Sequence, residues 1–249
     1  MPAGGRLASV TAFTPFSYVG TELEAVAEAR NYYNWIIDSF AGRVGDRAVE
    51  AGAGIGTVSS LILERGRPRE LVVIEPDAHN AAVLRRRFQD DARVIVHQGY
   101  LENLASSLRA DSVIAVNVLE HVERDADFLR AASAALAPNG ALLLLVPALP
   151  WIFGSLDRAF DHFRRYTRSG LEKQLRAAGF EVETLHYLNM VGVAAWFVSG
   201  RILRRTTLSR QQVRFYDRYV IPALRKIETR FHPPLGQSIL AIARKSNAS

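Results

Sequence analysis

A short glycine-rich segment contains the first residues whose spacing could bind a charged ligand. Glycine occupies alternate positions at Gly52, Gly54 and Gly56, and Glu50 precedes the first of them. Glycines let a backbone turn sharply and approach a ligand closely. A helix that begins near Thr57 would add unpaired amides and the positive end of its dipole. The segment therefore predicts a site for a cofactor that carries a carboxylate or a phosphate.

A second carboxylate follows at the end of the next expected strand. Glu75 lies nineteen residues after Gly56 and directly follows the apolar run 71–74. Open parallel sheets bind ligands at adjacent strand ends, where an acid can accept hydrogen bonds from ribose hydroxyls. The dinucleotide fingerprint G-x-G-x-x-G would need glycine at the position of Thr57. The pattern therefore favours a ribose-containing cofactor other than NAD.

Glu120 and His121 follow the fourth expected strand, at the same predicted edge of the sheet. Histidine accepts a proton near neutral pH, and a neighbouring carboxylate can orient it or bind a metal. We therefore consider a direct catalytic role for His121 beside a structural or cofactor-side role. Glu120 is a candidate for proton transfer or for a divalent metal.

The long segment 147–166 has no clear period and is too long for a simple tight connection. It contains Asp157, His162 and Arg165. We hypothesise that His162 or His121 acts as the general base, with Asp157 as an orienting carboxylate or a metal ligand. The alternatives are that His162 caps a helix or pairs with Asp161, and that Arg165 and its neighbour Arg164 face solvent instead of gripping an anion.

The elements that must position these residues alternate along the chain. Helix-forming stretches at 58–65, 79–88 and 125–136 separate apolar runs rich in Val, Ile and Leu. Continuous apolar strands at such intervals are typical of a parallel sheet covered on both faces. The expected strands are residues 48–50, 71–74, 94–97, 112–116 and 141–146, with a turn at 138–140 before the fifth.

The C-terminal part predicts a helix over 169–178, a strand over 181–187 and a last strand over 238–243. Between them, the run 211–231 implies one apolar helix face, kinked or divided by Pro222. That face comprises Val213, Tyr216, Val220, Leu224, Ile227 and Phe231. The apolar run 188–200 is too short to span a bilayer. We expect it to be buried beneath this helix; the alternative is peripheral contact with a membrane or a lipid-like acceptor, helped by the arginines that follow it.

Length and composition limit the remaining possibilities. A chain of 249 residues fits one domain, and the absence of cysteine excludes disulfides and thiolate chemistry. Residues 1–150 carry a net charge of −4 and residues 151–249 one of +10. This bias could serve an anionic substrate, a membrane surface or nucleic acid, or reflect solvated helix faces. The N-terminus shows no export signal, so we expect a cytoplasmic protein.

Residues 46–146 resemble the class I S-adenosylmethionine-dependent methyltransferase superfamily in the order of these motifs. The segment 147–167 is similar to a bacterial branch that modifies small molecules, sugars or lipids. The resemblance implies an α/β, Rossmann-like, doubly wound and mostly parallel seven-stranded sheet with helices on both faces and a C-terminal helical cap. It implies a cofactor core over about 40–147, acceptor loop and cap elements over about 148–235, and a last strand over about 237–244.

By the same resemblance, the glycines lie under the methionine part of the cofactor, Glu75 holds its ribose, and the residues after the third strand flank its adenine. The resemblance also implies that an aromatic side chain from the helix before the first strand covers the cofactor. For Trp35 on that helix, a place in the hydrophobic core is equally compatible with the sequence. The implied cofactor contacts are Tyr33, Glu50, Gly52, Ala53, Gly54, Gly56, Glu75, Pro76, Tyr100, Leu101, Asn117 and Val118. The implied acceptor wall contains Trp151, Arg165 and Tyr166.

The expected reaction is in-line transfer of a methyl group to a hydroxyl of a sugar, polyketide or lipid-linked intermediate, with S-adenosylhomocysteine as product. A divalent metal is an open alternative. C- or N-methylation of a small molecule and a non-catalytic cofactor-binding scaffold are the rival functions. Nucleic acid is not an expected partner, because Asn117 does not begin the Asn/Asp-Pro-Pro-aromatic motif of similar base-modifying enzymes. The oligomeric state is left open.

Overall fold

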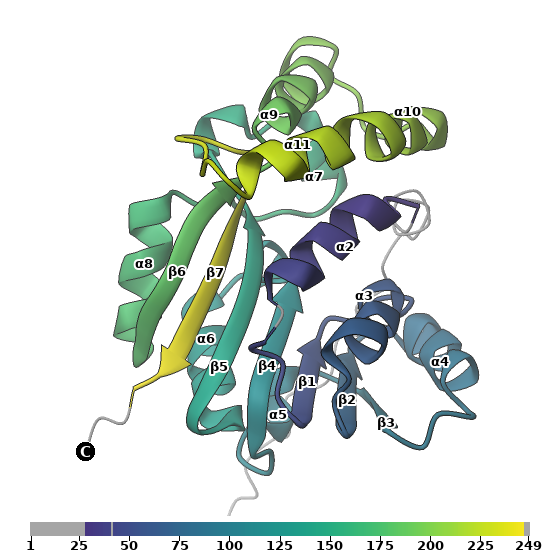
Figure 1. Cartoon of the computed structure of the whole chain (residues 1–249), viewed down its shortest axis with the longest axis vertical. Helices are drawn as coiled ribbons and strands as arrows, with labels where there is room; N and C mark the ends of the chain where they lie inside the picture. Colours follow the sequence, from purple (N-terminus) through teal and green to yellow (C-terminus); the bar gives the residue numbers. More distant parts are fainter. Residues whose placement is uncertain (1–27, 41, 247–249) are drawn as a thin grey trace, which may run out of the picture.

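Seven strands form one sheet in the order β3-β2-β1-β4-β5-β7-β6, and β7 alone runs opposite to the other six (Figure 1). The computed structural model describes residues 28–40 and 42–246, so the expectation about an export signal lies outside the described residues. The strands are β1 (Arg47–Ala51), β2 (Glu70–Glu75), β3 (Val94–Gln98), β4 (Ala110–Val116), β5 (Leu136–Pro147), β6 (Phe180–Leu188) and β7 (Ser238–Lys245). This arrangement confirms the predicted fold class.

Two apolar layers cover the sheet, one on each face. Strand side chains alternate between the faces, so Ala48 packs with one layer and Val49 with the other. One layer comes from α2 (Arg30–Ser39), α3 (Thr57–Leu61), η1 (Ile62–Gly66) and α4 (Ala78–Arg87). The other comes from α5 (Leu101–Leu104), α6 (Asp125–Ala135) and α8 (Arg168–Ala177). Both faces of the central strands are therefore buried, which accounts for their continuous apolar sequence.

The predicted turn at 138–140 is wrong, because these residues lie within β5. The register shifts between Ala110, which pairs with Leu136, and Ser112, which pairs with Ala141. Asn139 adopts a left-handed conformation with φ of 63°. The sequence Pro-Asn-Gly thus forms an irregularity within the strand instead of preceding it, as turn-forming residues do at a bulge.

A helical cap lies beyond the carboxyl ends of the parallel strands (Figure 1). It comprises α9 (Met190–Phe197), η4 (Val198–Ile202), α10 (Arg210–Phe215), η5 (Tyr216–Val220) and α11 (Ile221–Glu228). Below it, η3 (Pro150–Ile152) and α7 (Ser155–Ala159) interrupt the long segment after β5. None of the helices described is long and apolar enough to cross a membrane.

One expectation about the cap is wrong, and another holds only in part. Ile227 and Phe231 were expected on the inner face but are 57% and 73% exposed, whereas Ile221 and Leu224 are buried. The π-helical turn η5 changes the helix phase, so a strict three-or-four spacing fails across it. The run 188–200 is buried only in part: Leu188 packs with Ile221 and Leu224, whereas Val191 and Val198 are each 42% exposed.

Candidate active site

A cavity of about 1360 Å³ lies between the carboxyl edge of the sheet, α2 and the cap. Pockets for single small molecules usually measure roughly 300–1,000 Å³. This cavity therefore has room for a cofactor and a second reactant. Of the predicted cofactor contacts, all except Gly56 line it.

The glycine turn occupies the floor of this cavity. Gly52, Gly54 and Gly56 have φ values of 69°, 55° and 85°, a region that favours glycine. A Cβ on Gly52 would lie 2.6 Å from a methyl carbon of Val118. A Cβ on Gly56 would lie 2.8 Å from Leu84 on α4 instead. Gly56 therefore serves the packing of the turn against α4, while the other two glycines open the floor of the cavity.

Glu75 braces the glycine turn. Its Oε2 accepts a hydrogen bond from the Gly54 amide at 2.7 Å, and its Oε1 accepts one from the Asp77 amide at 3.0 Å. Both bonds lie at the end of β2, where the sequence placed a ribose-binding acid. Burial raises the pKa of Glu75. The carboxylate thus holds the turn and borders the cavity at the same time.

Glu50 supplies a buried carboxylate without a full set of partners. It is the last residue but one of β1, is 3% exposed and lines the cavity. Its Oε2 has no hydrogen-bond partner. Burial raises its pKa to about 8. A buried acid of this kind fits a ligand that brings a positive charge, because an ammonium group would satisfy the orphaned oxygen.

Asp157, from α7, stands at the centre of a buried network. It is fully buried, and its Oδ1 receives hydrogen bonds from His162 Nδ1 at 3.1 Å and Arg165 Nε at 2.6 Å. Its Oδ2 accepts hydrogen bonds from Trp196 Nε1 at 3.0 Å and from the Gly154 amide at 2.8 Å. Burial alone would raise its pKa, but these hydrogen bonds and the charge of Arg165 lower it to about 2. The geometry supports the orienting role for Asp157 over metal ligation, since donors occupy both of its oxygens.

The Asp157 bond fixes the His162 imidazole. A carboxylate that accepts the Nδ1 proton leaves the Nε2 lone pair available, as in a His-Asp dyad. The His162 side chain is only 8% exposed and lines the cavity. Its ring lies 4.8 Å, centre to centre, from that of His121 in an edge-on arrangement. His162 is thus the side chain in this cavity that geometry prepares best for accepting a proton.

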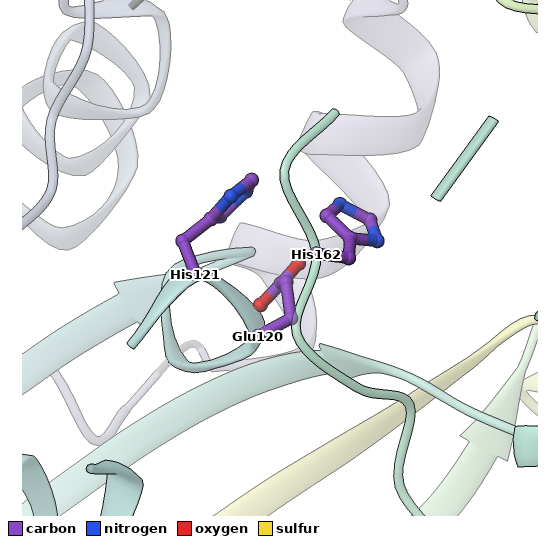
Figure 2. A group of neighbouring side chains, drawn as sticks. All are labelled: Glu120, His121 and His162. Atoms are coloured by element: carbon purple, nitrogen blue, oxygen red, sulfur yellow. The ribbon is translucent and has the colours of Figure 1, made fainter. Parts of the chain in front are cut away.

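Glu120 and His121, from η2 (Leu119–His121), gather with His162 around one point (Figure 2). One ligand atom from each lies within 4.8 Å of the others, a donor set that could hold a divalent cation. Burial raises the pKa of Glu120 to about 7. Burial and then the nearby His162 lower the pKa of His121 to about 3. His121 therefore remains neutral and weakly basic near physiological pH.

The predicted acceptor residues divide into two groups. Arg165 lines the cavity, but its charge is matched by Asp157, and its Nη1 donates to the Ala148 carbonyl at 2.9 Å. Trp151 is 55% exposed and packs against Phe197, outside the cavity. Tyr166 is buried in the core and bonds the Leu119 carbonyl. The structure therefore does not bring Trp151 or Tyr166 to the cavity.

The structure also places the other arginine of the loop, Arg164, and the aromatic residues of α2. Arg164 pairs with Asp125 at 2.9 Å and bonds the Glu123 carbonyl, so it fixes the loop instead of gripping an anion. Trp35 is a core residue, 3% exposed, whereas Tyr33 borders the cavity. Sequence reasoning missed Trp196 as a partner of Asp157. The one signal was a tryptophan in an apolar run, whose indole N–H needs a partner when buried.

The chain is similar in sequence to known methyltransferases. A family model described as "Methyltransferase domain" matches residues 17–185. Ubiquinone biosynthesis O-methyltransferase from Azorhizobium caulinodans is 29% identical over 156 residues, which cover 57% of this chain and 61% of that protein. Ornithine lipid N-methyltransferase from Singulisphaera acidiphila is 29% identical over 121 residues, covering 45% and 62%. The matches thus span about three fifths of these relatives.

Two solved structures share the fold at low identity. An S-adenosylmethionine-dependent methyltransferase from Mesorhizobium loti has a TM-score of 0.56 at 15% identity, covering 84% of this chain and 95% of that one. Geranyl diphosphate C-methyltransferase from Streptomyces coelicolor, solved with S-adenosylhomocysteine, has a TM-score of 0.59 at 15% identity, covering 86% and 75%. The names of the two relatives and of the Streptomyces coelicolor protein give oxygen, nitrogen and carbon as the methylated atoms.

Proposed function

We propose that this chain, which belongs to the family of methyltransferase domains, transfers the methyl group of S-adenosylmethionine to a hydroxyl oxygen of a small molecule. The observation that carries the choice of oxygen is the bond between His162 Nδ1 and Asp157. A hydroxyl must lose its proton during transfer, and this pair places an oriented base in the cavity. O-methylation is therefore the reaction that uses the site most fully.

The volume of the cavity and the buried carboxyl of Glu50 suit S-adenosylmethionine. The orphaned Glu50 oxygen would receive the ammonium of the methionine part, and the glycine turn would lie beneath it. Glu75 would meet the ribose, as acids at this strand end do. Tyr100 and Leu101 would border the adenine, with Asn117 and Val118 under the sulfonium. When bound, the cofactor supplies an electrophilic methyl group.

His162 then serves the acceptor. Its Nε2 would accept the proton that the hydroxyl gives up as the methyl group of the cofactor moves from sulfur to oxygen, and Asp157 would stabilise the imidazolium that results. Arg165 and Trp196 hold Asp157 in place. Glu120, whose pKa is about 7, can take up the proton next. A cavity that takes both the cofactor and the acceptor would hold the reacting groups together, which is the main contribution of such sites.

Cofactor binding is expected to release a proton near pH 7. Glu50 is mostly protonated there, and an ammonium placed beside it would favour its charged form. Up to about one proton leaves on binding, so affinity rises as pH is raised from about 6 to 7.5. Calorimetry in buffers of different ionisation enthalpy measures this release. Equal heats in both buffers, or an unchanged release in Glu50→Gln, would contradict the assignment.

An acceptor screen tests the proposed function itself. The protein is incubated with methyl-labelled S-adenosylmethionine and hydroxylated metabolites, glycosides and lipid-linked alcohols, and the product is analysed for the methylated atom. We expect methyl ethers. Methylation at nitrogen or carbon would establish the rival reaction, and cofactor binding without transfer to any acceptor class would support the scaffold alternative.

A further inference from the structure

The cap exposes an unusual amount of apolar surface. Ten of the fourteen large apolar side chains that are exposed among the described residues lie between 190 and 235. They are Met190, Val191, Val198, Ile202, Leu203, Phe215, Tyr219, Ile227, Phe231 and Leu235. The family match ends at residue 185, so this surface belongs to a part of the chain beyond the shared domain. Clustering of this kind marks an interaction surface.

The apolar side chains form stripes on the outer sides of the cap helices. Along α10, η5 and α11, Phe215, Tyr219 and Ile227 are about 60% exposed. The opposite side carries the buried Ile221 and Leu224, which pack against the core. The helix is therefore apolar on two opposite faces, and only one of them is needed for folding.

The same surface is strongly basic. Residues 189–236 contain nine Arg and Lys residues but only two acids, Asp217 and Glu228, and both acids are buried. The net charge is thus +7 over 48 residues. Arg204, Arg218 and Lys226 are exposed and form no ion pair among the described residues. Arg214 pairs with Glu28, and Arg225 pairs with Asp38.

We propose that this cap surface, the exposed side chains of residues 190–235, binds the surface of an anionic lipid bilayer. Apolar and aromatic side chains between arginines are what an interfacial helix presents to headgroups and acyl chains. Each basic residue near an anionic leaflet adds to the attraction. A second copy of the chain is a poorer occupant, because a symmetric interface would bring two faces of charge +7 together.

The cavity reaches this surface from within. Val198, Leu203, Leu208 and Phe215 line it, and the first, second and fourth are also exposed. If the proposed function holds, the docked cap would let an amphiphilic hydroxylated acceptor pass from the bilayer to His162. The acceptor class is then a lipid or lipid-linked molecule. Docking itself requires neither the cofactor nor the reaction.

Sedimentation with vesicles tests the docking. The full chain is spun with phosphatidylcholine vesicles and with vesicles that contain about 30% phosphatidylglycerol, in about 0.1 M salt. Two cap variants are compared: Tyr219→Ser with Ile227→Ser, and Arg204→Gln with Arg218→Gln. The charge-matched control is Arg85→Gln with Arg86→Gln, on exposed positions of α4 far along the chain from the cap. Circular dichroism verifies that each variant is folded.

We expect the wild type to bind the anionic vesicles at least about tenfold more tightly than the neutral ones. Each cap variant should lose about tenfold in affinity for the anionic vesicles. The control should stay within about twofold. Equal partitioning into both vesicles, or cap variants that bind like the wild type, would overturn the proposal. A stable dimer seen by light scattering and lost in the Tyr219/Ile227 variant would identify a second copy as the occupant instead. Because no cofactor or acceptor is present, failure of the methylation proposal leaves this result unaffected.

Discussion

Replacing His162 by glutamine is expected to lower the turnover number by roughly 10²–10⁴-fold, the usual contribution of a positioned general base. The imidazole lies in the cavity with Nδ1 held by Asp157, so Nε2 is set to receive the hydroxyl proton. Affinity for S-adenosylmethionine should change less than about twofold, because the proposal assigns this residue to the acceptor and not to the cofactor contacts. Initial-rate kinetics with the acceptor found in the screen, together with calorimetry, measures both quantities.

The neighbouring His121→Gln variant is the matched control. Burial and His162 lower the pKa of His121 to about 3, which makes it too weak a base near neutral pH. Its removal should cost less than about tenfold in turnover. A larger loss in His121→Gln than in His162→Gln would reverse the assignment. Loss of turnover on chelation, restored by a divalent cation, would favour a metal held by Glu120, His121 and His162 over proton transfer.

Replacing Asp157 by alanine is expected to lower the free energy of unfolding by roughly 3–5 kcal/mol. The substitution leaves the Arg165 guanidinium buried without its carboxylate and removes the partner of the Trp196 indole. Denaturant unfolding with unchanged slope would measure the loss. Asp127, a partly exposed residue that pairs with Arg124 and Arg130, is the control: Asp127→Ala should cost at most about 1 kcal/mol.

A double substitution separates the charge from the packing. Asp157→Ala with Arg165→Met removes both buried charges and should recover a large part of the stability lost in Asp157→Ala. The double variant should nevertheless stay nearly inactive, since the His162 imidazole loses its orienting carboxylate. Additive losses from the two substitutions would show that the buried pair is not coupled as the geometry indicates.

The sequence predicted the core of the fold because local patterns and tertiary structure agree there. The strand at 112–116 is apolar on both faces, since helices cover both sides of the sheet. The residues of the cavity floor could also be predicted from the sequence. Turn geometry indicates Gly52 and Gly54, and strand order indicates the acids Glu50 and Glu75 near the strand ends. These features depend on residues that are close in the chain.

Features that depend on distant contacts were harder to predict. Trp151 and Tyr166 belong to a polar, aromatic loop, but only packing decides that one lies outside and the other in the core. The link between Asp157 and Trp196 spans 39 positions and has no sequence signature. In the cap, the π-helical turn shifted the apolar positions, which left Ile227 at the surface. An apolar spacing alone cannot show which of two apolar helix faces is buried.

Calorimetric titration of the purified protein with S-adenosylmethionine and S-adenosylhomocysteine tests the central claim most directly. We expect micromolar-range binding by the wild type. Binding should be lost in Gly54→Arg, which fills the cavity floor, and in Glu75→Ala, which removes the acceptor of the Gly54 amide hydrogen bond. Absence of binding by the folded wild-type protein, or full binding by folded Gly54→Arg, would contradict the assignment of this cavity to the cofactor.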